Sequence, residues 1–125
     1  GSFMKTSLYS LFLFLILNQS VLGAREQLEA NTKKELIEVL VANEQLHSAF
    51  FKYNSNEIEK NAKIMSEKVQ KISDKKILSM LKFANTKLLE LKSSNKKEDN
   101  NKNYHIVSTA MIYIMNKYDL GSQYN

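Results

Sequence analysis

The chain contains no cysteine, no proline and no tryptophan, and only three of its 125 residues are glycine. Without cysteine, no disulfide can crosslink the fold and no thiolate can serve as a nucleophile or metal ligand. Without proline, and with Gly121 as the only glycine after residue 23, few residues favour tight turns. The composition therefore favours helices over a turn-rich β fold, held together by its apolar core alone.

Arginine is also nearly absent. Arg25 is the only arginine among 18 basic residues, and the lysines alternate with 13 acidic residues along the chain to leave a net charge of +5. Proteins that bind nucleic acids more often show clustered arginine together with exposed aromatic platforms. We therefore interpret the charge as a solvated, lysine-rich surface and expect no nucleic-acid partner.

The N-terminal region is typical of a targeting sequence. Residues 1–3 precede the first methionine and are interpreted as a cloning remnant. Residues 4–24 contain a basic start, an apolar run of ten residues at Leu8–Leu17, and small residues at Gly23 and Ala24, where cleavage is expected. The run is too short to cross a bilayer, which needs about 20 residues. We expect a secretory signal peptide, with an uncleaved anchor as the alternative, and an exported protein, periplasmic or secreted, with no stable membrane span after cleavage.

Residues 25–125 are expected to form one domain of four helices, of which the first two are indicated by apolar periodicity and capping residues. The first runs from about Thr32 to Tyr53 and begins with a capping box formed by Thr32 and Glu35. The second has Asn56 as its N-cap and ends at Asp74. Its apolar residues recur at spacings of four, three, four and three, the pattern of a packed helix seam.

The remaining two helices are separated by a polar connection at residues 92–103. The third helix runs as one segment from the cap at Asp74 to about Leu91. The fourth can begin within the connection, at a second capping box in residues 95–98, and is expected to end near Gly121 in a Schellman motif. Four helices with short joins predict an all-α, up-down-up-down four-helix bundle.

The last helix contains the most apolar segment of the domain, Tyr104–Tyr118, around which we expect the other helices to pack. Its largest side chains lie on one face: Tyr104, Val107, Met111, Ile114, Met115 and Tyr118. Three further apolar residues, Ile106, Ile112 and Tyr113, point away from this seam. If they are exposed, they form a patch larger than a soluble monomer usually shows, and we predict that they contact a partner or a C-terminal segment that this sequence lacks.

The chain has two histidines, His47 and His105, which an antiparallel bundle would place at nearly the same height. Together with the thioether of Met111 they are the candidate ligands for a soft metal such as copper. Two alternatives remain. His47 falls within the apolar face of the first helix and can instead hydrogen-bond within the core, and methionine at helical spacing is commonly a core residue.

The chain shows no motif that supports an enzyme. No serine–histidine–aspartate pattern or glycine-rich phosphate loop occurs. The single Glu44-x-x-His47 pair has the spacing found in di-iron carboxylate bundles, but such sites need the motif twice and further glutamates. We therefore expect a non-catalytic protein.

Two segments carry a resemblance to a known family. They are Val41–Phe50, with the second helix through Ala62, and Tyr104–Met111, leading to Tyr118. From about residue 37 onward, the chain resembles a family of exported helical domains of unknown function. Members occur alone or fused to the periplasmic adaptor proteins of copper and silver efflux pumps.

The resemblance has two implications for function. The family continues after its last helix with a Cys-Pro-Met segment that suggests copper binding, and this sequence ends at Asn125, before that place. The resemblance therefore implies a missing C-terminal segment, with the present residues serving as scaffold plus His47, His105 and Met111. The sequence predicts a module that binds or hands over a soft metal. The alternative is an interaction or structural domain of the cell envelope that binds a protein partner or self-associates, without metal.

Overall fold

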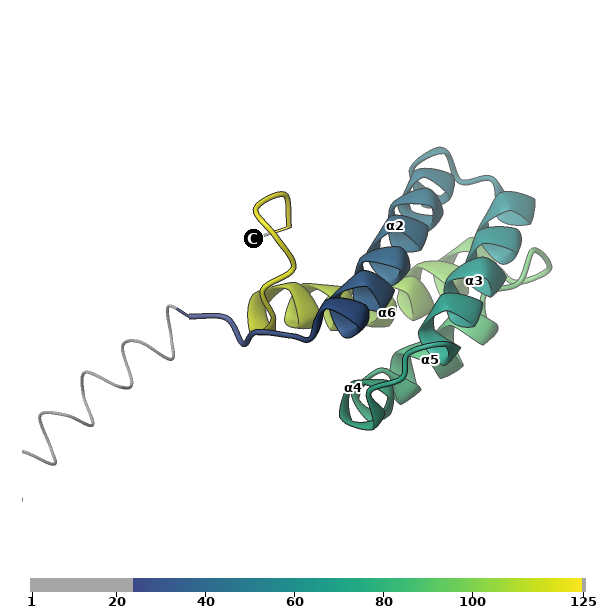
Figure 1. Cartoon of the computed structure of the whole chain (residues 1–125). Coiled ribbons are helices and arrows are strands. Elements are labelled where there is room, and N and C mark those ends of the chain that lie inside the picture. The colour runs from purple at the N-terminus through teal and green to yellow at the C-terminus, as the bar shows by residue number, and fades with distance from the viewer. Residues whose placement is uncertain (1–23, 125) are drawn as a thin grey trace, which may run out of the picture.

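The computed structural model describes residues 24–124, and every regular element in this range is an α-helix (Figure 1). The helices are α2 (Ala30–Lys52), α3 (Ser55–Gln70), α4 (Lys75–Met80), α5 (Lys82–Leu89) and α6 (Lys97–Lys117). The all-α prediction is confirmed. The predicted signal peptide and the three residues before it lie outside the described residues, except for Ala24. Within residues 24–124, no helix combines the length and apolar character needed to cross a membrane.

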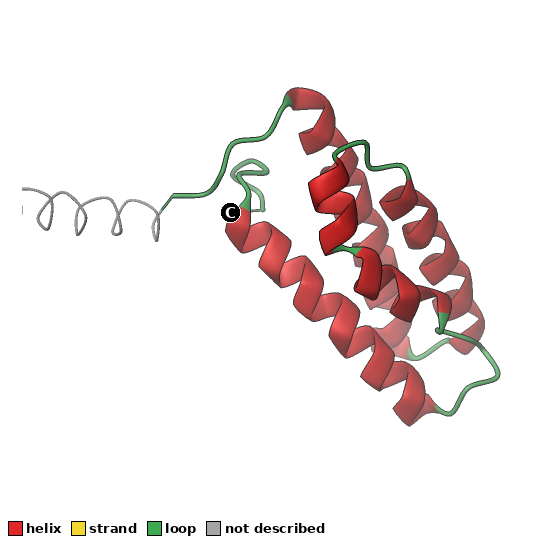
Figure 2. Ribbon diagram, turned by 90° about the horizontal axis from the view of Figure 1, so that it is seen from below, coloured by secondary structure: helices red, strands yellow, loops and turns green. Residues whose placement is uncertain are grey.

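The helices pack in chain order. Helix α3 contacts both α2 and α5, and α6 contacts α5. Figure 2 shows α6 lying alongside the segment formed by α4 and α5. Helices α2 and α6 meet through long side chains, since the ring of Phe50 stacks on that of Tyr104 with 4.5 Å between centroids.

The third predicted helix is interrupted at Leu81, which separates α4 from α5. Its backbone has φ −94° and ψ 1°, and its N–H donates to the carbonyls of both Ile77 and Leu78, at 3.1 and 3.2 Å. No proline or glycine causes this break. The inward spacing of four, three, four and three nevertheless continues through it, and all five residues on that spacing are buried: Ile77, Leu81, Ala84, Leu88 and Leu91.

Helix α2 does not begin with the predicted capping box. It starts at Ala30, and Thr32 is buried within its first turn. The carboxylate of Glu35 instead accepts hydrogen bonds from the backbone N–H and the hydroxyl of Ser73, at 3.1 and 3.0 Å. This glutamate therefore joins the start of α2 to the loop after α3, a contact between residues far apart in the sequence.

The other helix starts were predicted with mixed success. Asn54, rather than Asn56, caps α3 by accepting from the N–H of Glu57 at 3.1 Å. Asp74 caps α4 as predicted, accepting from the N–H of Ile77 at 3.0 Å. Helix α6 begins inside the polar connection, as expected, but its N-cap residue Lys96 has no side-chain cap.

The C-terminal end of α6 differs from the prediction because the N-terminal segment pairs with it. The helix ends at Lys117, and Tyr118 is extended. The N–H of Glu26 donates to the carbonyl of Lys117 at 2.8 Å, and the N–H of Asp119 donates to the carbonyl of Glu26 at 2.9 Å. Gly121 does have a positive φ of 105°, but it lies beyond the helix, so the predicted Schellman motif does not form.

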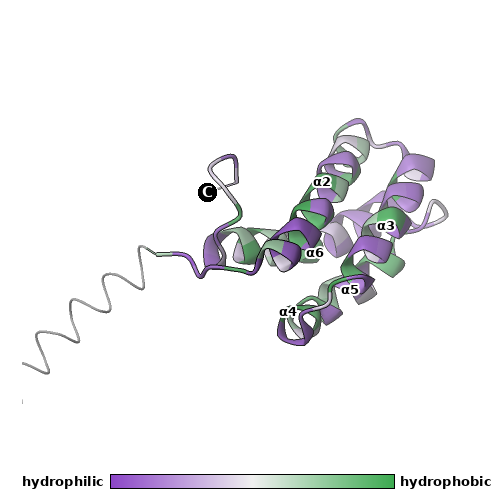
Figure 3. Ribbon diagram, in the orientation of Figure 1, coloured by the Kyte–Doolittle hydropathy of each residue, from purple (hydrophilic) through white to green (hydrophobic). Residues whose placement is uncertain are grey.

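One apolar core connects all five helices. Figure 3 shows apolar residues on the sides of the helices that face one another. The predicted seam of α6 is confirmed, because Tyr104, Val107, Met111, Ile114 and Tyr118 are all buried in this core and Met115 is half-buried against it. Leu120, after the helix, is buried in the same core.

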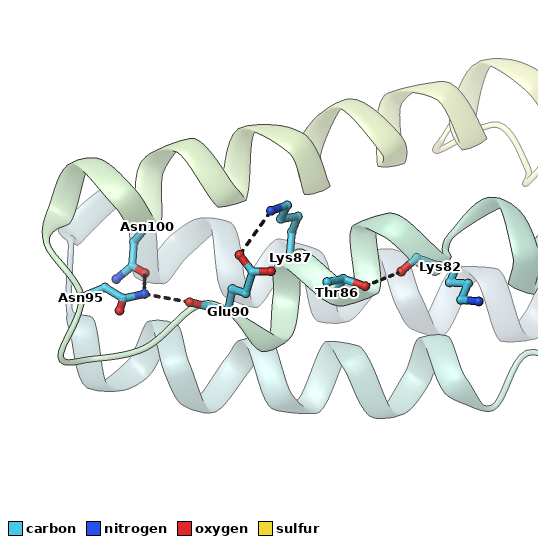
Figure 4. A network of polar contacts seen from close by, with 6 residues as sticks. All are labelled: Lys82, Thr86, Lys87, Glu90, Asn95 and Asn100. Atoms are coloured by element: carbon cyan, nitrogen blue, oxygen red, sulfur yellow. Dashed lines mark hydrogen bonds and ion pairs between the residues drawn. The ribbon is translucent and has the colours of Figure 1, made fainter.

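A buried asparagine holds the loop between α5 and α6. Asn100 is fully buried, and its amide N–H groups donate to the carbonyl of Lys92 and to the hydroxyl of Tyr53, at 2.9 and 3.1 Å. Its carbonyl accepts from the amide of Asn95 at 3.0 Å (Figure 4). Asn95 also donates to the carbonyl of Glu90 at 2.7 Å. The loop is therefore attached to α6 by side-chain amides.

Candidate interaction groove

The three predicted metal ligands lie in different environments. His47 is exposed on α2 and His105 is exposed on α6, whereas Met111 is buried in the core. The ring of His47 lies 6.2 Å from that of Tyr104, which directly precedes His105, so both histidines are near the same turn of α6. The alternative interpretation, in which His47 hydrogen-bonds within the core, is wrong because its side chain faces solvent.

The buried polar contact between α2 and α6 is made instead by Tyr104 and Asn43. The Tyr104 hydroxyl donates to the Asn43 side-chain carbonyl at 2.9 Å. Burial raises the pKa of Tyr104 to about 12, because the ionised phenolate would lose its hydration. Among residues 24–124, no group of three or more histidine, aspartate or glutamate residues is arranged to hold a metal ion.

The three predicted interaction residues lie on the solvent side of α6. Ile106 is half-buried, and the side chains of Ile112 and Tyr113 are 53% and 54% exposed. Ile106 and Tyr113 both line a groove, whereas Ile112 does not. The predicted apolar surface is therefore partly concave.

The groove lies between α6 and the segment formed by α4 and α5, and its volume is about 620 Å³. Its lining is mainly apolar and comprises Lys76, Met80, Leu81, Phe83, Ala84, Ile106, Thr109, Ala110, Tyr113, Ile114 and Lys117. Ala84 and Ala110 are small residues on the two facing helices, so the surface is hollow between the larger side chains. This volume is within the range of small-molecule binding pockets.

Phe83 is an exposed aromatic residue of the groove. Its position beside Leu81 and Ala84 suggests a broadened core face, but its ring is 62% exposed. The ammonium of Lys87 lies 5.3 Å from the ring centroid, in cation–π geometry. A large aromatic ring left in solvent at the edge of an apolar groove is a feature of a binding surface rather than of a core.

The segments that line the groove contain basic residues but no acidic ones, whereas the first turn of α6, before these segments, contains Glu98 and Asp99. Residues 75–89 and 103–117 include five lysines, at positions 75, 76, 82, 87 and 117, while all 13 acidic residues lie elsewhere. Two of these lysines have acidic partners outside the two segments. Lys117 pairs with Glu26 at 2.7 Å, and Lys87 pairs with Glu90 at 3.2 Å. The hydrogen bond between Lys117 and Glu26 raises the pKa of the lysine and lowers that of the carboxyl.

A second groove, between α2 and α3, has a different character. Its volume is about 360 Å³, and it includes Val41 and Ile64. It also contains both Glu38 and Lys68, which form an ion pair at 3.5 Å. Because this groove is smaller, the α4–α5–α6 groove is the better candidate for a binding site.

Comparisons with known proteins give no information about the candidate groove. A scan against protein-family models, a search of curated proteins and a search of solved structures each found no match. These comparisons therefore provide no link to the efflux-adaptor domains, and the resemblance stated above stays a prediction.

Proposed function

We propose that this protein is a non-catalytic interaction module that binds a protein partner in the α4–α5–α6 groove. In this proposal the protein is exported, and α4 and α5 together count as the third helix of an up-down-up-down four-helix bundle. The observation that supports it most directly is the apolar groove itself, bordered by the exposed rings of Phe83 and Tyr113.

The aromatic residues at the edge are the expected source of binding energy. Aromatic side chains dominate the energetic centres of protein interfaces, because they bury a large area with few rotatable bonds. Phe83 and Tyr113 come from the two sides of the groove, α5 and α6. An apolar side chain of a partner placed over the two alanines would enter the groove that both rings line.

The test is selection of binders from an unbiased library of displayed helical peptides, using the full chain as the target. Affinities are then measured by fluorescence anisotropy for wild type, Phe83→Ser and Phe51→Ser. Phe51 is the matched control because it is 86% exposed and does not line the groove. We expect Phe83→Ser to weaken the selected peptides by about 30-fold, the effect of losing an interface hot spot.

The opposite pattern would contradict the proposal. If the selection finds no binders, or if all of them are insensitive to Phe83→Ser, the groove is not the interaction surface. Circular dichroism of both variants controls for folding, and since both rings are exposed, we expect the thermal midpoints to stay close to that of wild type.

A soft-metal function remains the second candidate, because His47 and His105 lie near the same turn of α6. Cu(I) and Zn(II) are titrated into the protein while the histidine ring and methionine methyl NMR signals are followed. Shifts at His47, His105 and Met111 with an affinity tighter than millimolar would support a metal site. Unmoved signals at these residues would remove it.

A further inference from the structure

We infer that the occupant of the α4–α5–α6 groove is an amphipathic helix of another protein, with acidic residues beside its apolar face. The inference rests on the proposed function and adds the chemical class of the partner. The shape of the groove, its exposure and the signs of the charges around it each support this assignment.

The shape of the groove suits a helix. On α6 the lining extends from Ile106 to Lys117, and at 1.5 Å per residue this distance is about 16 Å, or about three helical turns. An amphipathic helix of that length presents apolar side chains at positions i, i+3 or i+4, and i+7 on one face. These side chains would fit the hollow between the large residues of α5 and α6.

The exposure of the lining favours a protein segment over a small molecule. Small ligands are typically buried over 70–90% of their surface. Phe83 and Tyr113 remain more than half exposed although they line the groove. Such an open groove can cover one face of a helix, whose other face stays in solvent.

The charges of the lining favour an acidic helix. Lys76 and Lys117 are the only charged residues that line the groove, and Lys87 lies over the Phe83 ring at its edge. Lys117 also pairs with Glu26 and Lys87 with Glu90, whereas Lys76 makes no ion pair within the described residues. A helix placed between these ammonium groups is favoured by carboxylates on its flanks and disfavoured by basic residues. A second copy of this chain binding through the same face would bring lysine against lysine, so charge also argues against symmetric self-association.

The test uses three synthetic 18-residue helices with the same apolar face and with Glu, Gln or Lys at the flanking positions. Binding to the full chain is measured by fluorescence anisotropy at low and moderate salt. The domain variants are Lys76→Glu and its matched control Lys75→Glu. Both lysines are exposed, but Lys75 borders a different pocket, on the other side of α4.

We expect the Glu peptide to bind most tightly and to weaken as salt increases. Lys76→Glu should weaken it by about fivefold, since one attractive charge pair is replaced by a repulsive one. Lys75→Glu makes the same change in net charge and should alter the affinity by less than about twofold. Lys76→Glu should also bind the Lys peptide more tightly than wild type does.

The outcomes separate this inference from the proposed function. If the Gln or Lys peptide binds as tightly as the Glu peptide and Phe83→Ser abolishes binding, the groove binds a helix but the acidic class is wrong. If no peptide binding depends on Phe83, the proposed function fails as well. Binding to phosphatidylglycerol vesicles that depends on both Phe83 and Lys76, without peptide binding, would overturn the inference in favour of an anionic membrane surface.

Discussion

Asn100 shows how much structure one buried polar side chain can organise. It connects the loop before α6 to the end of α2 by bonding Lys92, Asn95 and Tyr53. The described residues contain no buried side-chain nitrogen or oxygen that lacks a hydrogen-bond partner. Removing this amide would therefore leave several groups without their partners.

We predict that Asn100→Ala lowers the free energy of unfolding by about 2–3 kcal/mol, because buried polar groups lose their hydrogen bonds. Urea denaturation followed by circular dichroism measures this change. The neighbouring Asn101 is exposed, so Asn101→Ala is the control and should change stability by less than about 0.5 kcal/mol. Equal effects of the two substitutions would show that the Asn100 network does not stabilise the fold.

A second prediction at the residue scale concerns acid stability. Glu59 accepts from the backbone N–H of Ser93 at 2.7 Å and pairs with Lys63 at 3.2 Å. The Ser93 backbone hydrogen bond, followed by the hydrogen bond from Lys63, lowers its pKa from 4.5 to about 2. Because the folded state holds the ionised form, its stabilising contribution is present above pH 4.5 and is lost as the pH falls towards 2.

We therefore expect Glu59→Gln to be less stable than wild type at pH 6, with the difference shrinking between pH 4.5 and 2. Thermal melting across this pH range provides the measurement. Glu67 is exposed on the same helix, and Glu67→Gln serves as the control. A difference between wild type and Glu59→Gln that stays constant from pH 6 to pH 2 would show that ionisation of Glu59 is not responsible.

At the scale of elements, the N-terminal segment closes the end of α6. The side-chain Nε of Arg25 donates to the carbonyl of Met115 at 2.8 Å, and Gln27 donates to the carboxylate of Asp119 at 3.0 Å. Carbonyls in the last turn of a helix lack partners within it, so a cationic donor is favourable at this position. The backbone hydrogen bonds of Glu26 with Lys117 and Asp119 also explain why the helix ends at Lys117 rather than close to Gly121.

We predict that Arg25→Ala destabilises the fold by about 1 kcal/mol, the typical contribution of one hydrogen bond. Hydrogen exchange should accelerate at the amide of Tyr118, which lies at this helix end, while amides in the middle of α3 change little. Glu29→Ala is the control within the same segment, because this exposed residue makes no side-chain cap. Unchanged exchange at Tyr118 in Arg25→Ala would contradict a closing role for the arginine.

The break at Leu81 is a further property of an element that local sequence does not explain. The residues around it favour a continuous helix, and their inward faces keep one spacing throughout. After the break, the side-chain carbonyl of Asn85 accepts from the buried hydroxyl of Ser66 on α3 at 2.6 Å. The hydrogen bond between Ser66 and Asn85 depends on how α3 and α5 pack. No sequence pattern within residues 75–89 could therefore indicate this contact.

For the whole molecule, the single core implies that the helices unfold together. Leu46 is completely buried in α2, and its cluster includes residues from every described helix. We predict that Leu46→Ala lowers the free energy of unfolding by about 2–5 kcal/mol. Far-UV circular dichroism and near-UV tyrosine signals should give coincident transitions in wild type and variant.

Val41→Ala is the matched control in the same helix. Val41 is almost half exposed, so this variant should change stability by about 0.5 kcal/mol or less. Separate transitions from the two optical signals would show that the helices form more than one cooperative unit.

The sequence by itself determined the helical class, most helix positions and the inward face of α6, because these follow from the period of 3.6 residues and from local capping groups such as Asp74. Only the tertiary structure decided the exposure of His47 and Phe83, the burial of Asn100, and the pairing of Glu26 with Tyr118. The physical reason is that these properties depend on neighbours from distant segments, as in the bond between Arg25 and Met115, 90 residues apart. The groove is of the same kind, since small residues on α5 and α6 make a hollow only when the two helices lie side by side.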